Sequence, residues 1–243
     1  DAVQFFSEAN AKKVNELLVN PFYLTKLSDF YLSNRALPKK SEIMDKLIEC
    51  SFELDEDKYS GNLSEHYYDL FSSLEKIAFS MQLMKKYVLE DRSEYQRLFG
   101  CDIRSLVKQS GLFKREKTGW SFSHNNFREY LAAKQISKLS KEEAVSIFAH
   151  ESNIKPSWVN TLGYFTMLDL SWDLQEWLVQ NSPTAIVKFE SDRVDKDQRF
   201  EIFEHIFTEY EKKHLHFDDD LCDTLELACF ADSNKTLSFL LER

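Results

Sequence analysis

The segment LFKREKTGWSFSHNNFREYLAAKQISKL (residues 112–139) decides the fold of the middle of the chain. It begins with two short β-prone runs, LFKRE and WSFS, which are joined by a tight turn that contains a glycine. This pattern predicts a β-hairpin. The rest of the segment has helical spacing, with Asn125 or Asn126 as the expected cap. The titratable ring of His124 therefore stands at the junction between a strand and a helix.

The residues before the hairpin predict two short helices. A capping box at 93–96 begins the first of them, which ends near Gly100, and 101–109 forms the second. Helix, short helix, hairpin and helix follow one another in a winged-helix module, which is a variant of the helix-turn-helix. We therefore expect a winged-helix domain over residues 65–139.

The first part of the chain predicts a helical subdomain over residues 1–64. Apolar residues have roughly helical spacing over 2–19, and Asn20-Pro21 predicts a cap and the start of a second helix. A third helix is expected over 41–53, followed by a polar loop that begins near Asp55. A long helix then opens the winged-helix domain, over about 65–86, with one stripe formed by Tyr68, Phe71, Leu74, Ile77, Ala78, Met81 and Met84.

The last part of the chain, residues 140–243, predicts helices only. Their lengths suit paired helices that stack into a HEAT-like or other superhelical region. The expected fold is therefore mainly α, with a helical subdomain, a winged-helix module with one β-hairpin, and an α-helical repeat-like region. Five glycines in 243 residues agree with this fold, because tight turns are few.

Charge and cysteine content restrict the function. The net charge of −10 disfavours general binding to nucleic acid or to an anionic membrane. Residues 95–134 nevertheless carry a net charge of +5, and residues 190–243 carry −8. Four cysteines without a C-x-x-C pair, together with the lack of an apolar run long enough to cross a bilayer, predict a cytoplasmic protein with reduced thiols.

Two segments together resemble a known family. NPFYLTKL at 20–27 and GLFKREKTGWSFSHNNFREYLAAKQI at 111–136 resemble a pairing in the NACHT-type signalling NTPases, which belong to the STAND class with the animal NOD-like receptors. The second segment is similar to the motif F-x-H-x-x-F-x-E-Y-L-A-A, which ends the winged-helix domain of that family. The matching positions are Phe122, His124, Phe127, Glu129, Tyr130, Leu131, Ala132 and Ala133. The first segment resembles the proline-bearing part of the family's first helical domain.

The resemblance implies a nucleotide site. By analogy with the family, Pro21 would lie against the adenine and sugar of the nucleotide, and His124 would reach the β-phosphate of bound ADP. The intact protein would bind ADP or ATP with Mg²⁺ and would close on ADP at rest. A protein ligand or effector sensed through the helical region would permit nucleotide exchange and oligomerisation.

No phosphate-binding loop occurs in the sequence. The pattern G-x-x-x-x-G-K-[ST] is absent, and none of the five glycines lies in an arrangement that could cradle phosphates. Without that loop this chain is not expected to catalyse phosphoryl transfer, so we expect no enzyme activity from it. Because the chain begins at Asp1, within a predicted helix, we expect it to be an excised piece of a longer NTPase whose P-loop domain lies upstream.

Other interpretations stay open at this stage. His124 could pack and hydrogen-bond within its own corner, and Pro21 could be an ordinary proline at a helix start. Aromatic and aliphatic residues of the motif, namely Phe127, Tyr130, Leu131 and Ala132, are expected in the core under either interpretation, and Glu129 is expected in a structural hydrogen bond or ion pair.

Two rival functions also remain. A DNA-binding winged helix would use a basic cluster for phosphate contacts, formed by Arg104, Lys108, Lys114, Arg115 and Lys117. The acidic total charge makes nucleic-acid binding the weaker alternative. The other rival is a scaffold whose helical tail binds a protein partner without any ligand switch.

Overall fold

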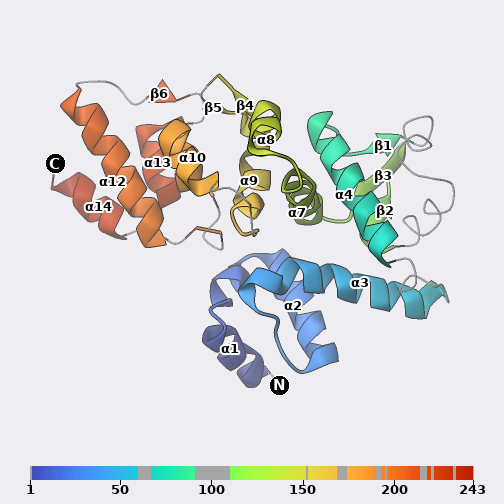
Figure 1. The fold of residues 1–243 in the computed structure, drawn as a ribbon. Coiled ribbons are helices and arrows are strands. Elements are labelled where there is room, and N and C mark those ends of the chain that lie inside the picture. The colour runs from blue at the N-terminus through green and yellow to red at the C-terminus, as the bar shows by residue number, and fades with distance from the viewer. Residues whose placement is uncertain are drawn as a thin grey trace. The chain divides into compact units, whose positions relative to one another are not determined.

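The computed structural model describes most of the chain, namely residues 2–59, 67–90, 110–151, 153–168, 174–189, 193–194, 196–213, 218–219, 222–231 and 234–242. They form a mainly helical protein with small antiparallel sheets, which confirms the predicted fold class (Figure 1). The chain divides into two compact units, Asp1–Ile136 and Ser137–Arg243. The short helices predicted at 93–100 and 101–109 lie outside the described residues.

The first helix is shorter than predicted. Helix α1 covers Ala2–Ala11, and a 3-10 helix follows over Asn15–Val19. Lys13 separates them with a left-handed φ of 56°. The amide of Val14 donates to the Ala9 carbonyl at 2.9 Å, and the amide of Lys13 donates to the Asn10 carbonyl at 3.1 Å. This is a Schellman ending formed without glycine, so the prediction of one helix over 2–19 is wrong.

The start of the second helix is confirmed. Helix α2 covers Pro21–Asn34, and the Asn20 side chain accepts a hydrogen bond from the Phe22 amide at 3.0 Å. Pro21 occupies the first helical position, where it has no amide hydrogen to leave unpaired. Helix α3 covers Ile43–Tyr59 and passes through Asp55, where a loop was predicted. The rest of that predicted loop lies outside the described residues.

Helix α4 (Tyr67–Leu83) packs along α7 (Asn125–Ile136) to form the core of the first unit (Figure 1). The buried face of α4 is fully enclosed and consists of Leu70, Leu74, Ile77, Ala78 and Met81. Two members of the predicted stripe are exposed, Tyr68 at 88% and Met84 at 42%, and Phe71 is only half-buried. Lys85 (φ 53°) ends α4 in a second Schellman arrangement.

The predicted hairpin is present, and a third strand joins it. Strands β2 (Phe113–Arg115) and β3 (Gly119–Phe122) pair antiparallel, with Phe113 opposite Phe122. Strand β1 (Leu89–Glu90) pairs with the other edge of β3, which gives the order β1-β3-β2. Gly119 permits this approach, because a Cβ at this position would overlap the Leu89 carbonyl. The module predicted with one hairpin therefore has a three-stranded sheet.

The described residues of the second unit are mainly helical, as predicted for residues 140–243. The helices are α8 (Lys141–Phe148), α9 (Val159–Phe165) after a 3-10 turn over Pro156–Trp158, α10 (Leu174–Asn181), α11 (Pro183–Val187), α12 (Lys196–Lys212), α13 (Thr224–Ala231) and α14 (Asn234–Leu241). A capping box begins α8: the Ser140 hydroxyl accepts from the Glu143 amide at 3.3 Å, and the Glu143 carboxylate accepts from the Ser140 amide at 3.0 Å.

Two small hairpins interrupt these helices. Strands β4 (Ala149–His150) and β5 (Asn153–Ile154) pair antiparallel, as do β6 (Asp218–Asp219) and β7 (Cys222–Asp223). The prediction of helices alone is therefore wrong for this unit. Its core includes a cluster from α11, α12 and α13 formed by Val187, Phe203, Ile206, Leu227 and Ala231.

Candidate functional site

His124 caps the helix that follows it. Its ring lies between the end of β3 and the start of α7, and Nδ1 accepts a hydrogen bond from the Asn126 amide at 3.2 Å. An acceptor on the residue before a helix satisfies one of the amides that the first turn leaves unpaired. The cap is therefore His124 itself, and the prediction that Asn125 or Asn126 serves as the cap is wrong.

The same ring contacts a helix about one hundred residues earlier in the chain. The ring of His124 stacks on Phe22 of α2, with centroids 4.1 Å apart and planes inclined by 24°. Phe22 also meets Phe127 of α7 edge to face at 5.2 Å. His124 is thus half-buried between the first helical segment and its own helix, rather than enclosed by its own module.

Phe22 brings the two predicted site segments together. Pro21 is exposed at the first position of α2, and the next residue is the one that stacks on His124. Sequence reasoning placed Pro21 and His124 in a common site but gave Phe22 no part in it. The only signal in the sequence was its position directly after the proline, in the segment NPFYLTKL.

The His124 ring favours its neutral form. Burial lowers the pKa of His124 below its ordinary value, and the positive charges of Lys114 and Lys26 lower it further, while the Asn126 side chain acts in the opposite direction. Because Nδ1 accepts the Asn126 amide hydrogen, the proton of the neutral ring belongs on Nε2. The ring can therefore offer one N–H donor to a ligand.

The cations near His124 differ in their partners. Lys114 pairs with Glu116 at 3.2 Å, and the Glu116 carboxylate also accepts the Ser121 hydroxyl at 3.0 Å. Among the residues that the structure describes, half-buried Lys26 makes no hydrogen bond or ion pair through its side chain. The region around the ring thus holds an ammonium group that pairs with no carboxylate of the described residues.

The two units differ in their suitability for an anion. Asp1–Ile136 has 20 Lys and Arg against 20 Asp and Glu, whereas Ser137–Arg243 has 11 against 21 and so carries the whole net charge of −10. An anionic ligand is therefore repelled less by the first unit.

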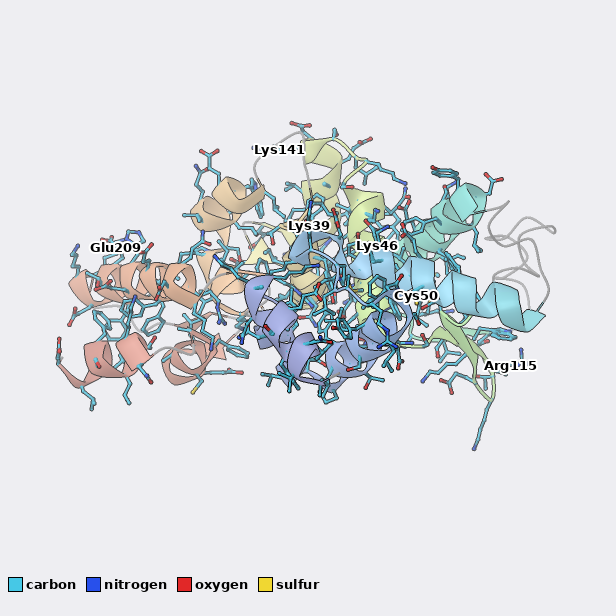
Figure 2. All side chains as sticks on the ribbon, turned by 90° about the horizontal axis from the view of Figure 1, so that it is seen from below. Lys39, Lys46, Cys50, Arg115, Lys141 and Glu209 are labelled. Atoms are coloured by element: carbon cyan, nitrogen blue, oxygen red, sulfur yellow. The ribbon has the colours of Figure 1, made fainter. Side chains whose placement is uncertain are left out.

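A cavity of about 240 Å³ in the second unit is lined by residues of α10, α11 and α12. Glu209, which Figure 2 labels, contributes to its wall. A hydrogen bond from Lys212 lowers the pKa of this carboxyl, and Lys213 lies 3.6 Å away. The carboxylate that lines the cavity is therefore already paired with lysine side chains.

The remaining motif residues have structural roles. Phe127, Tyr130, Leu131 and Ala132 are buried, as predicted. The prediction of an ion pair for Glu129 is confirmed by its carboxylate, which lies 3.7 Å from the guanidinium of Arg128.

The basic hairpin is only partly available to a partner. Arg115, labelled in Figure 2, lies over the Trp120 ring with its guanidinium carbon 5.1 Å from the ring centroid. Lys117 is exposed, and Lys114 is paired with Glu116. The other two cations of the predicted DNA-binding cluster, Arg104 and Lys108, lie outside the described residues.

Comparisons with known proteins do not place the chain in a family. No family model, no curated protein and no solved structure matches it. Within the part of the chain that the structure describes, no three histidine, cysteine or acidic side chains are grouped to hold a metal ion. In the same part, no helix has the length and apolar character that crossing a membrane requires.

Proposed function

We propose that this chain is the regulatory part of a signalling ATPase of the STAND or NACHT kind. It would close on bound ADP through His124 and couple ligand sensing to nucleotide exchange and oligomerisation. The observation that supports this most strongly is the stacking of His124 on Phe22, because it joins the two segments on which the resemblance rests. A site shared between two segments can respond to their relative movement.

The residues present fit a phosphate ligand. The Nε2–H of His124 is a donor, and Lys26 supplies positive charge beside it. A phosphate placed there would favour the charged form of the ring, so the ring would bind more strongly as it gained a proton. Pro21, exposed at the start of α2, could lie against the base and sugar of the same nucleotide.

The proposal requires a P-loop domain as partner. ADP or ATP would be held there with Mg²⁺, and His124 would add its contact only while the partner domain and this chain are closed. A nucleotide-dependent switch needs a contact that exists only in the closed state. The reason is that a ligand shifts the equilibrium between open and closed states only by its difference in affinity for the two. A protein ligand bound through the helices of Ser137–Arg243 would favour the open state.

The direct test compares His124→Asn with wild type in a protein that contains both the P-loop domain and this chain. Asparagine preserves a side-chain cap but removes the ring and its Nε2–H. We expect ADP to dissociate about tenfold faster or more, since a hydrogen bond to a charged group contributes roughly 1.5–3 kcal/mol. An unchanged dissociation rate, measured with a fluorescent ADP analogue, would restrict His124 to capping and packing.

The exposed basic residues of the hairpin favour one other function, the binding of duplex DNA. The pairing of Lys114 with Glu116 balances one of these charges, and the net charge of −10 opposes an approach to phosphates. We therefore expect little binding of duplex DNA at physiological salt. Salt-sensitive submicromolar affinity, lost in a Arg115→Ala, Lys117→Ala variant, would favour the DNA-binding function instead.

A further inference from the structure

The cavity in the second unit is built against one face of α12. His205, Ile206, Glu209 and Tyr210 line it, and they share that face because they lie one or four residues apart in an uninterrupted helix. Ile206 is buried in the core of the unit, whereas His205 is exposed. The cavity therefore lies where the core face of α12 meets solvent.

Another wall of the cavity is the bend between α10 and α11. Helix α10 ends at Asn181 and α11 begins at Pro183, so the chain turns at Ser182 without a loop. The conformation of Ser182, with φ −152° and ψ 62°, is not helical, and a residue before proline disfavours the helical conformation. Nδ2 of Asn181 donates to the Trp177 carbonyl at 2.8 Å, so its Oδ1 keeps its capacity to accept a hydrogen bond.

The size and charge of the cavity define its ligand. Its volume of about 240 Å³ is below the roughly 300–1,000 Å³ of pockets that hold drug-sized ligands, so it suits a single side chain. The described residues that line it include no lysine or arginine, while Glu209, labelled in Figure 2, supplies a carboxylate. The unit around it has 21 Asp and Glu against 11 Lys and Arg. The cavity therefore favours a cation over an anion.

The lysines that pair with Glu209 do not exclude such a ligand. Lys212 lies 3.3 Å from Oε1 and Lys213 lies 3.6 Å from Oε2, three and four residues further along the same helix. Both lysine side chains are more than half exposed, and exposed pairs of this kind contribute little. A carboxylate has about four acceptor positions, so Glu209 can accept from a ligand as well.

We propose that this cavity binds the guanidinium side chain of an arginine on a protein partner. The planar guanidinium matches the geometry of the Glu209 carboxylate, and its five N–H donors let it use Oδ1 of Asn181 too. Val179 and Ile206 offer apolar surface to the methylene stem. Free arginine is a poorer ligand, because the acidic unit repels its carboxylate. Only an effect of this binding on nucleotide exchange rests on the proposed function.

The experiment titrates the 243-residue chain with a blocked glycine-arginine-glycine tripeptide and follows the amide chemical shifts of α10 and α12. The control tripeptide has citrulline in place of arginine, which keeps the shape and removes the charge. Glu209→Gln removes the carboxylate, and Val179→Phe fills the cavity from an exposed position. The matched control is Glu201→Gln, because Glu201 is an exposed residue of α12 that does not line the cavity.

We expect the arginine tripeptide to bind wild type and Glu201→Gln equally, in the millimolar range. Glu209→Gln should bind it about tenfold more weakly, since a hydrogen bond to a charged group is lost, and the citrulline tripeptide should lose about as much on wild type. Val179→Phe should abolish binding.

Four results would overturn the proposal. They are a wild-type chain that does not respond up to tens of millimolar, equal affinity of Glu209→Gln and Glu201→Gln, equal affinity of the two tripeptides, and binding that persists in Val179→Phe. Tighter binding of free arginine than of the tripeptide would overturn a protein partner as the source of the guanidinium. Each result is independent of the contact between His124 and a nucleotide, which the ADP dissociation rate tests.

Discussion

Replacing His124 separates its two structural contributions, the cap on α7 and the stack on Phe22. His124→Ala removes both. The loss of a side-chain cap costs about 1 kcal/mol, and an aromatic pair contributes about 1 kcal/mol beyond the area it buries. We therefore expect His124→Ala to lower the free energy of unfolding by about 2 kcal/mol at pH 7.5. His124→Asn keeps an acceptor for the Asn126 amide and should lose only about half of this.

Urea denaturation followed by circular dichroism measures these differences as shifts in the transition of the first unit, and amide hydrogen exchange at Asn126 reports the cap directly. A double-mutant cycle with Phe22→Leu isolates the stack, for which we expect a coupling energy of about 1 kcal/mol. Equal destabilisation by alanine and asparagine, with equal exchange at Asn126, would refute the cap. A coupling energy near zero would refute the stack.

Two further predictions concern the same unit. The pKa of folded His124 is lowered below its ordinary value of about 6.5, so the unfolded chain binds the proton first as the pH falls. The stability of wild type relative to His124→Asn should therefore decline below about pH 6.5 and level off below the folded pKa. A stability difference that does not change between pH 7.5 and pH 5 would contradict the lowered pKa. Gly119→Ala should destabilise the sheet by about 1–3 kcal/mol, because the new Cβ would overlap the Leu89 carbonyl. The control, Lys117→Ala at an exposed position of the same hairpin, should cost less than about 0.5 kcal/mol. Equal melting temperatures for the two variants would show that β1 can move aside.

Local signals predicted the elements that depend on neighbouring residues. The start of α2 was predictable because Asn20 and Pro21 are respectively a cap and a first-turn residue, and both act within one turn. The β2–β3 hairpin was predictable because two β-prone runs flank a short turn. In both cases the residues that make the structure lie within about ten positions of one another.

Elements that depend on distant partners were not predictable in the same way. Strand β1 has only two residues, and it forms because Gly119, about thirty residues later, lets its backbone come close. The ends of α1 and α4 carry lysine at the left-handed position, where glycine is the usual signal. The small β4–β5 hairpin likewise turns at Glu151, whose φ is 54°.

The candidate site was predictable in part. The position of His124 at a strand–helix junction followed from the pattern of residues 112–139, and the structure has the junction there. Its use as the cap was not expected, because imidazole is not among the preferred capping side chains. The contact with Phe22 could not be inferred from spacing, since it joins residues about one hundred positions apart.

The central claim is that Nε2 of His124 meets a nucleotide phosphate, and the pKa of this ring with and without ADP tests it most directly. Histidine-ring chemical shifts are followed between pH 5 and pH 8 in a protein that contains both the P-loop domain and this chain, with saturating ADP and with adenosine at the same concentration as the control. The proposal predicts that ADP raises the pKa of His124 and that adenosine leaves it unchanged. A His124 pKa that is the same with ADP as with adenosine would contradict the phosphate contact and leave His124 as a cap stacked on Phe22.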